Sequence, residues 1–323
     1  MKDIYFMVQQ SLIFIIPLLI VALGGMFSEK SGVINIALEG IMIIGAFCGI
    51  MFINLMQSAN KLMGSPQILL LFACLIATIG GTIYSALLAY ASINLKADQV
   101  IGGTALNLLA PALVIFIART RTTVKQIYFN PVFGIKKIPI LGDIPLIGNL
   151  FFQNTYITTF LGLLILILSY IILYKMRFGL RLSACGEHPQ AAASVGVNVY
   201  KMRWSGVLIS GALGGLGGLI YVVPVAVSYS GDVGGYGFLA LAVMIFGQWK
   251  PLRIFLAAIF FGFFKALAST YIILDFIMDL NIPNIDYIFK MIPYFATLIV
   301  LIFTSKKSRA PKAEGIPYEA GAR

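Results

Sequence analysis

The spacing of charged residues most limits what this chain can fold into. Seven long windows contain no Asp, Glu, Lys or Arg: residues 4–28, 40–60, 62–95, 99–118, 154–174, 204–231 and 233–249. A helix that crosses the ~30 Å hydrocarbon layer of a bilayer needs about 20 mostly apolar residues. Only 11% of the residues are charged, whereas a soluble domain carries about 25%. These features predict an all-α, polytopic transmembrane helix bundle.

We expect about nine spans, within a range of about 8–10, and some discontinuous or broken helices. They are placed near residues 8–27, 34–56, 67–93, 100–118, 155–174, 204–225, 237–249, 254–274 and 287–305. Residues 1–305 then form one transmembrane domain, with an outer loop at 119–154 and a cytoplasmic loop at 175–203. Residues 306–323 form a short polar tail, which we expect to be disordered or loosely bound to a partner.

The basic residues predict the orientation, because Lys and Arg in short loops favour the cytoplasmic side. Two segments are rich in them: the loop with Lys175, Arg177, Arg181, Lys201 and Arg203, and the tail with Lys306, Lys307, Arg309, Lys312 and Arg323. We therefore expect a cytoplasmic C-terminus and an N-terminus outside. The outer loop opposes this rule, because it carries Arg119, Arg121, Lys125, Lys136 and Lys137. Either it departs from a statistical rule, or a span before it is miscounted.

The scarcity of reactive side chains excludes several functions. One histidine, His188, and three scattered cysteines give no metal site and no catalytic residues. The formal charge of +11 is explained by the membrane loops, so no nucleic acid partner is expected. The chain has no G-x-x-x-x-G-K-[ST] phosphate loop, so any ATP and Mg²⁺ must be bound by another chain.

The first candidate interruption of a span is Ser31-Gly32-Val33-Ile34-Asn35-Ile36-Ala37-Leu38-Glu39-Gly40. Gly32 and Gly40 permit backbone that is not regular helix. Asn35 and Glu39 are four apart and would share a face on a helix. An ionisable residue at membrane depth is a functional candidate. Alternatively, Glu39 lies at the cytoplasmic interface and pairs with Lys30 or with a helix N-terminus.

A second candidate interruption runs from Ser230 and Gly231 through three further glycines to Phe238. The predicted topology places the two interruptions toward opposite membrane faces. Matching breaks in halves of opposite orientation are typical of inverted-repeat transporters. The alternative is an ordinary turn, since turns in any membrane protein are rich in glycine.

A third glycine-rich segment has small residues four apart twice, Gly211 with Gly215 and Gly214 with Gly218. This spacing lets helix backbones approach closely in lipid. We favour helix packing, with a place along a translocation path as the alternative.

The cytoplasmic loop contains Gly186-Glu187-His188-Pro189-Gln190-Ala191-Ala192-Ala193. Glu187 can cap a helix, Pro189 suits its first turn, and Gly196 can end it. The pattern predicts a short helix of about two turns at the inner face. It is either a plain connector or an element that a partner grips.

These segments resemble the permease subunits of the branched-chain amino acid, ribose and nucleoside class of bacterial ATP-binding-cassette (ABC) importers. The resemblance covers nearly the whole chain and rests on three places: Glu29 to Gly40, Gly186 to Ala192 with Gly196, and Ser210 to Gly218. Within the class, the first motif, the segment from Ile138 to Gly148 and the tail from Ala310 to Tyr318 look closest to nucleoside-type permeases. His188 departs from the more usual Asn of the family.

The resemblance implies a permease in the bacterial cell membrane that imports nucleosides while a partner hydrolyses ATP. It implies ABC ATPase subunits docked on residues 186–193, a second, related permease subunit and an extracellular substrate-binding lipoprotein. Ribose, other sugars or branched-chain amino acids are alternative substrates. An ion-coupled carrier needs buried ionisable groups, and only Glu39 and Lys265 are candidates. A membrane-embedded enzyme needs clustered His, Asp or Glu.

Overall fold

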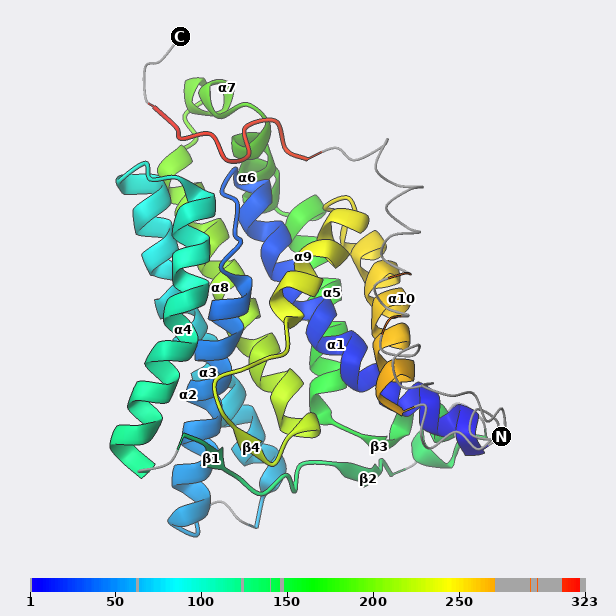
Figure 1. Ribbon diagram of the computed structural model, residues 1–323. Helices are drawn as coiled ribbons and strands as arrows, with labels where there is room; N and C mark the ends of the chain where they lie inside the picture. The colour runs from blue at the N-terminus through cyan, green and yellow to red at the C-terminus, as the bar shows by residue number, and fades with distance from the viewer. Residues whose placement is uncertain are drawn as a thin grey trace.

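A computed structural model describes residues 2–61, 64–122, 125–139, 141–145, 148–270, 291, 295 and 310–319. Within them, long helices form a bundle (Figure 1). Seven helical stretches are long and apolar enough to cross a membrane. They are α1 (Lys2–Lys30), α2 (Leu38–Ser58), α3 (Pro66–Ala89) continued by the π-helical turn η1 (Tyr90–Asn94), α4 (Gln99–Thr122), α5 (Ile157–Lys175), α8 (Val199–Val225) and α10 (Pro251–Thr270). The polytopic all-α prediction is confirmed, while the span expected at 287–305 falls outside the described residues except for 291 and 295.

The predicted span at 237–249 is not one continuous helix. Helix α9 covers only Tyr236–Phe246, about 16 Å at 1.5 Å per residue, which is too short to cross the hydrocarbon layer. Residues 226–235, here called the second break, precede it and include the short strand β4 (Ser228–Tyr229). Figure 1 shows them rising from the end of α8 to the middle of the bundle, where α9 begins. Extended backbone and helix therefore share this crossing.

Residues 31–37, here called the first break, have the corresponding position after α1. They are not helical, and their second residue, Gly32, has φ of 95°. The chain turns at the end of α1 and returns toward the middle of the bundle, where α2 begins and runs the opposite way to α9 (Figure 1). The units α1–first break–α2 and α8–second break–α9 thus have opposite orientations. This is the arrangement expected of an inverted repeat.

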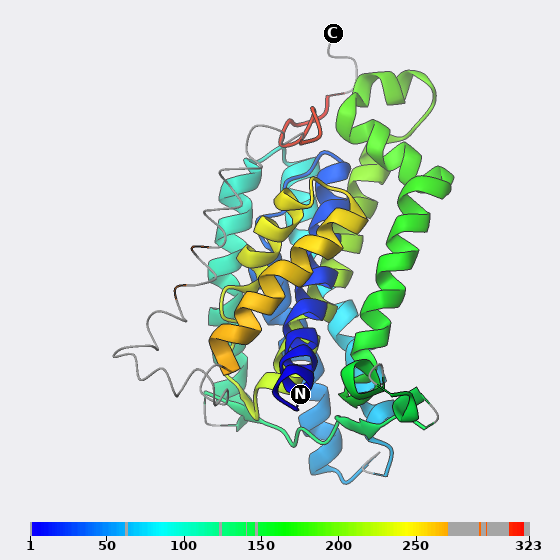
Figure 2. The same cartoon turned by 90° about the vertical axis from the view of Figure 1, so that its right-hand side faces the viewer.

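The two ends of the bundle differ in structure. One end holds α6 (Arg177–Glu187), α7 (Pro189–Ser194) and residues 310–319, and the other holds the N-terminus (Figures 1 and 2). The described residues of the predicted outer loop lie at the N-terminal end and form short strands and turns. Its elements are β1 (Ile127–Tyr128), which pairs with β4, β2 (Ile135–Lys137), which pairs with β3 (Gln153–Thr155), and the turns η2 (Leu141–Asp143) and η3 (Gly148–Phe152).

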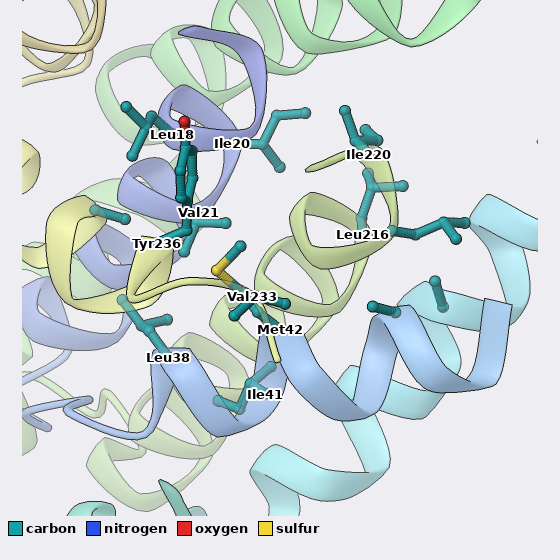
Figure 3. Close-up of a cluster of buried hydrophobic side chains, with 14 of the residues drawn as sticks. Leu18, Ile20, Val21, Leu38, Ile41, Met42, Leu216, Ile220, Val233 and Tyr236 are labelled. Carbon is teal, nitrogen blue, oxygen red and sulfur yellow. The ribbon is translucent and has the colours of Figure 1, made fainter. Parts of the chain in front are cut away.

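Close backbone packing of α8 forms the centre of the bundle. A Cβ added at Gly215 would overlap the Ala77 carbonyl oxygen of α3, and one at Gly218 would overlap the Met42 carbonyl oxygen of α2. Gly211 likewise faces α3, and Gly214 faces α2. Side chains from α1, α2, α8 and the second break then fill the space around them (Figure 3). The core thus lies where the two breaks meet.

Candidate functional site

The Glu39 carboxylate joins the two units of opposite orientation in the middle of the bundle. One oxygen accepts a hydrogen bond from the Gly235 N–H at 2.9 Å, and the other accepts one from the Gly237 N–H at 2.6 Å. These N–H groups belong to the first turn of α9, whose positive end favours an anion. Glu39 itself lies in the first turn of α2 and is 7% exposed. The partner of Glu39 expected from the sequence was Lys30 or a helix N-terminus at the cytoplasmic interface. In the structure the partner is a helix N-terminus, and the contact lies inside the bundle.

Side chains of α4 satisfy the backbone of the first break. Gln99 accepts a hydrogen bond from the Ile34 N–H at 2.7 Å. Asn107 accepts one from the Gly40 N–H at 2.8 Å and donates one to the Ile36 carbonyl at 2.8 Å. Sequence reasoning missed both residues. The available signal was that they are amides in the otherwise apolar window 99–118.

The expectation that Asn35 and Glu39 share a helix face is wrong. Asn35 lies in the first break, before α2 starts at Leu38, and its amide donates to the Ser210 hydroxyl at 2.8 Å. The two side chains therefore point to different helices, Asn35 to α8 and Glu39 to α9. Ser31 is also buried, and its hydroxyl closes the end of α1 by donating to the Ser28 carbonyl at 2.6 Å.

The second break lies against α4 as well. Gly231 has φ of 82°, and its Cα faces Val114 and Pro111 of α4, whereas Ser230 is exposed. Asp232 is exposed and accepts a hydrogen bond from the Gly234 N–H at 2.9 Å. Both breaks are thus held by the same helix, so a displacement of α4 would reach both.

Two tyrosines and a lysine surround the start of α9. The Tyr236 ring stacks on that of Tyr221 with 3.9 Å between centroids. The Lys265 ammonium of α10 lies 5.8 Å from the Tyr236 ring centroid, within the range of a cation–π contact. The two ionisable residues singled out from the sequence, Glu39 and Lys265, therefore both approach this helix start. Among the described residues, no group of three or more His, Cys, Asp or Glu side chains could hold a metal ion.

The 175–203 loop is mostly helical and presents one surface outward. Its short helix α7 has Pro189 as its first residue, as expected. Glu187 is instead the last residue of α6, and His188 occupies the N-cap position without a side-chain capping bond. Of the predicted ATPase-docking residues 186–193, four are exposed: Glu187, His188, Gln190 and Ala191. Ala193 is half-buried, and Gly186, Pro189 and Ala192 are buried.

Two residues just past α7 complete this surface. Val195 is 78% exposed and was not singled out from the sequence. Gly196 follows with φ of 84°, which ends the helix as expected. Ala191 and Val195 give the outward tip of α7 an exposed apolar patch next to the exposed polar residues of the same surface. Such a tip is suited to contact with another protein.

Comparisons with known proteins identify the family to which the chain belongs. Residues 7–301 match the family model described as the branched-chain amino acid transport system / permease component. The nucleoside ABC transporter permease protein NupC of Lactococcus lactis is 42% identical over 96% of each chain. The guanosine ABC transporter permease protein NupQ of Bacillus subtilis is 42% identical over 98% of this chain and 97% of its own. The L. lactis nucleoside ABC transporter permease protein NupB is 23% identical over 76% of this chain and 68% of its own. No solved structure matches.

Proposed function

The chain belongs to the permease family of branched-chain amino acid transport systems, and from this premise we propose that its own substrates are nucleosides. It is a multi-pass membrane protein and a transport subunit of an ABC importer, not an enzyme. The observation that carries the substrate proposal is the 42% identity, over almost the full length, to two permeases named for nucleosides and guanosine. Sugars and branched-chain amino acids are the substrates that a direct uptake measurement must exclude.

The proposed handle for the ATPase is the outward surface of α7. Four residues are exposed at this short helix: Glu187, His188, Gln190 and Ala191. Pro189 and Ala192 are buried and hold the opposite side of the helix in place. A partner that binds such a surface can push or pull the helix without unfolding it. The end of the bundle that carries α7 is then cytoplasmic, and the N-terminus is outside.

The proposed translocation path follows the two breaks. Ser31, Gly32, Asn35, Glu39 and Gly40 belong to the first unit, and Ser230 and Gly231 belong to the second. Broken helices supply polar backbone at membrane depth, which is tolerated only where protein or a water-filled cavity covers it. Because Glu39 bonds across the two units, we place the opening and closing of the path at this contact.

The proposed assembly contains ATPase subunits at the α7 end, a second, related permease and an extracellular substrate-binding lipoprotein. L. lactis has two related nucleoside permeases, NupC and NupB, which supports pairing of two different chains. ATP and Mg²⁺ are bound by the ATPase, and the permease binds no cofactor of its own.

The test is the substitution Ala191→Arg in the complete transporter, reconstituted in vesicles with guanosine as substrate. The large charged side chain should block docking on α7, so that ATPase co-purification and guanosine uptake both fall at least tenfold while the permease still inserts. The matched control is Ala97→Arg, which alters an exposed alanine at the same end of the bundle, in the turn before α4. Normal co-purification and uptake for Ala191→Arg would contradict the proposal. Uptake of ribose or leucine instead of guanosine would contradict the substrate class.

A further inference from the structure

We infer that residues 311–319, here called the strap, transmit the movement of α7 to the two breaks, with Ala313, Gly315 and Tyr318 as the positioning residues for transport. This inference rests on the proposed function. The tail was expected to be disordered or loosely bound to a partner, but residues 311–319 lie across the α7 end of the bundle (Figures 1 and 2).

The strap is attached to the helices of the ATPase-facing loop. The Ala313 N–H donates to the Gly186 carbonyl at the end of α6 at 2.8 Å. Tyr318 packs on a small buried cluster formed by Cys185, Ala192 and Val199. Because Ala192 is the buried face of α7, Tyr318 forms part of the base on which α7 rests.

The same segment is attached to the first break. The Gly315 N–H donates to the Gly32 carbonyl at 3.2 Å. Gly315 has φ of 76°, and its Cα faces the Ile34 side chain. The strap thus bonds α6 through Ala313 and the first break through Gly315, two residues later.

A side-chain link extends from the strap to the second unit. The carboxyl groups of Glu314 and Glu29 are close neighbours that interact electrostatically. Glu29 also accepts a hydrogen bond from the Trp249 indole N–H at 2.5 Å. Trp249 lies in the turn that follows α9. Through Glu29 and Trp249, the strap is therefore linked to the C-terminal end of α9. The N-terminal end of the same helix is bonded to Glu39.

A buried arginine fixes the strap to α8. Arg203 is 1% exposed and donates from Nη1 to the Ile316 carbonyl at 2.8 Å. Its Nε and Nη2 have no hydrogen-bond partner among the described residues. The strap is therefore bonded to α8 as well as to α6 and the first break.

The experiment compares the complete transporter with a truncation that ends the permease at Arg309. We expect the truncated complex to keep its ATPase subunits and to hydrolyse ATP, while guanosine uptake falls at least tenfold. The number of ATP molecules hydrolysed per guanosine should therefore rise about tenfold, a ratio that a merely stabilising role would not change. Tyr318→Ala tests the same point in a full-length chain, with an expected rise of at least threefold. Lys312→Ala, an exposed strap residue, is the control and should behave as the unaltered protein.

Two outcomes would overturn the inference. One is an unchanged ratio in both the truncation and Tyr318→Ala. The other is a proportional loss of ATPase association and uptake, which would mean that the strap serves assembly only. If the truncation fails to insert, Tyr318→Ala decides alone. Ala191→Arg separates this test from that of the proposed function: if it loses its ATPase while the strap variants stay coupled, only the strap inference fails.

Discussion

At the scale of single residues, Glu39 was singled out from the sequence and makes the contacts that bear most directly on the proposed function. A carboxylate at membrane depth costs about 2.5–3.5 kcal/mol on insertion scales. Each hydrogen bond to a charged group returns about 1.5–3 kcal/mol, and Glu39 accepts one from Gly235 and one from Gly237. The two hydrogen bonds offset the cost of burying the charge, so the charged Glu39 is stable in the bundle only while the start of α9 lies beside it. Glu39 can thus hold the two broken units together.

The substitution Glu39→Gln tests this role. The amide keeps one acceptor oxygen but loses the charge and one bond, so we expect the closed arrangement to lose about 2 kcal/mol. Uptake should fall several-fold, and the unfolding temperature in detergent should drop. Asp232→Asn is the matched control, because Asp232 is an exposed acid that accepts one bond from its own loop. Equal effects of the two substitutions would argue against a special role for Glu39.

Glu314 gives the strap a dependence on pH. Burial raises the pKa of its carboxyl above the ordinary value. An acid whose pKa is higher when the strap is bound than when it is released stabilises the bound state in its protonated form. Strap binding is therefore strongest below the ordinary carboxyl pKa, and it weakens as the pH rises through the raised pKa.

Maleimide labelling can measure this dependence. In a background without native cysteines, Ala313→Cys places a thiol at a buried strap position, and Lys312→Cys places one at an exposed position. The labelling rate at 313 relative to 312 should increase with pH, because the comparison removes the ionisation of the thiol itself. Adding Glu314→Gln should reduce the increase. A flat ratio in the chain that retains Glu314 would contradict the prediction.

At the scale of elements, α8 is the helix around which the others pack. Its glycines bring its backbone against α2 and α3, where dispersion and close contact replace the hydrophobic effect that is absent in lipid. The sequence spacing predicted a packing face, but one helix carries two such faces. Gly211 and Gly215 meet α3, while Gly214 and Gly218 meet α2.

Gly215→Ala should therefore destabilise the bundle. The added methyl group would overlap backbone atoms of Ala77, and backbone cannot move aside as a side chain can. Overpacking of this kind costs about 1–3 kcal/mol, which thermal unfolding in detergent would detect. Gly102→Ala on α4 is the control, since the nearest atom to its added Cβ is 4.0 Å away. This second variant should be neutral or slightly stabilised, because alanine favours helix over glycine.

At the scale of the whole molecule, the bundle separates two functional ends. The helices α6 and α7 and the strap lie at one end, and the paired strands β1–β4 lie at the other with the N-terminus (Figure 1). The described residues of the 119–154 loop and the 175–203 loop lie at opposite ends of the bundle (Figure 1), as predicted from the sequence. Four long helices, α1 to α4, lead up to the basic residues near 119–137, as predicted, so the described residues show no miscounted span before the outer loop.

Labelling from each side of the bilayer tests which end is cytoplasmic. Val195→Cys, at the exposed tip beside α7, should react with an impermeant maleimide only in inside-out vesicles. Lys136→Cys, exposed at the other end, should react only in right-side-out vesicles. The reverse pattern would contradict the orientation and, with it, the assignment of α7 to the ATPase.

The sequence by itself determined the class of protein, most of the spans and the short helix α7. The signals for these features are local: long apolar windows, clusters of Lys and Arg, and a short segment bounded by Pro189 and Gly196. Each has one dominant physical interpretation. Ser31 to Gly40 and Ser230 to Phe238 could also be recognised as interruptions, because glycine in an apolar window disfavours continuous helix.

Only the tertiary structure decided which groups those interruptions bond. Asn35 bonds to Ser210, Glu39 to the start of α9, and Asn107 to the first break, across sequence separations of 175, 198 and 71 residues. Gln99 bonds to the first break across 65 residues. It also decided that a tail of ordinary polar composition is bound, through Arg203 and backbone groups of α6 and the first break. Local composition does not encode such partners. A polar group buried in a bundle bonds to whatever acceptor or donor the packing of distant helices brings within reach.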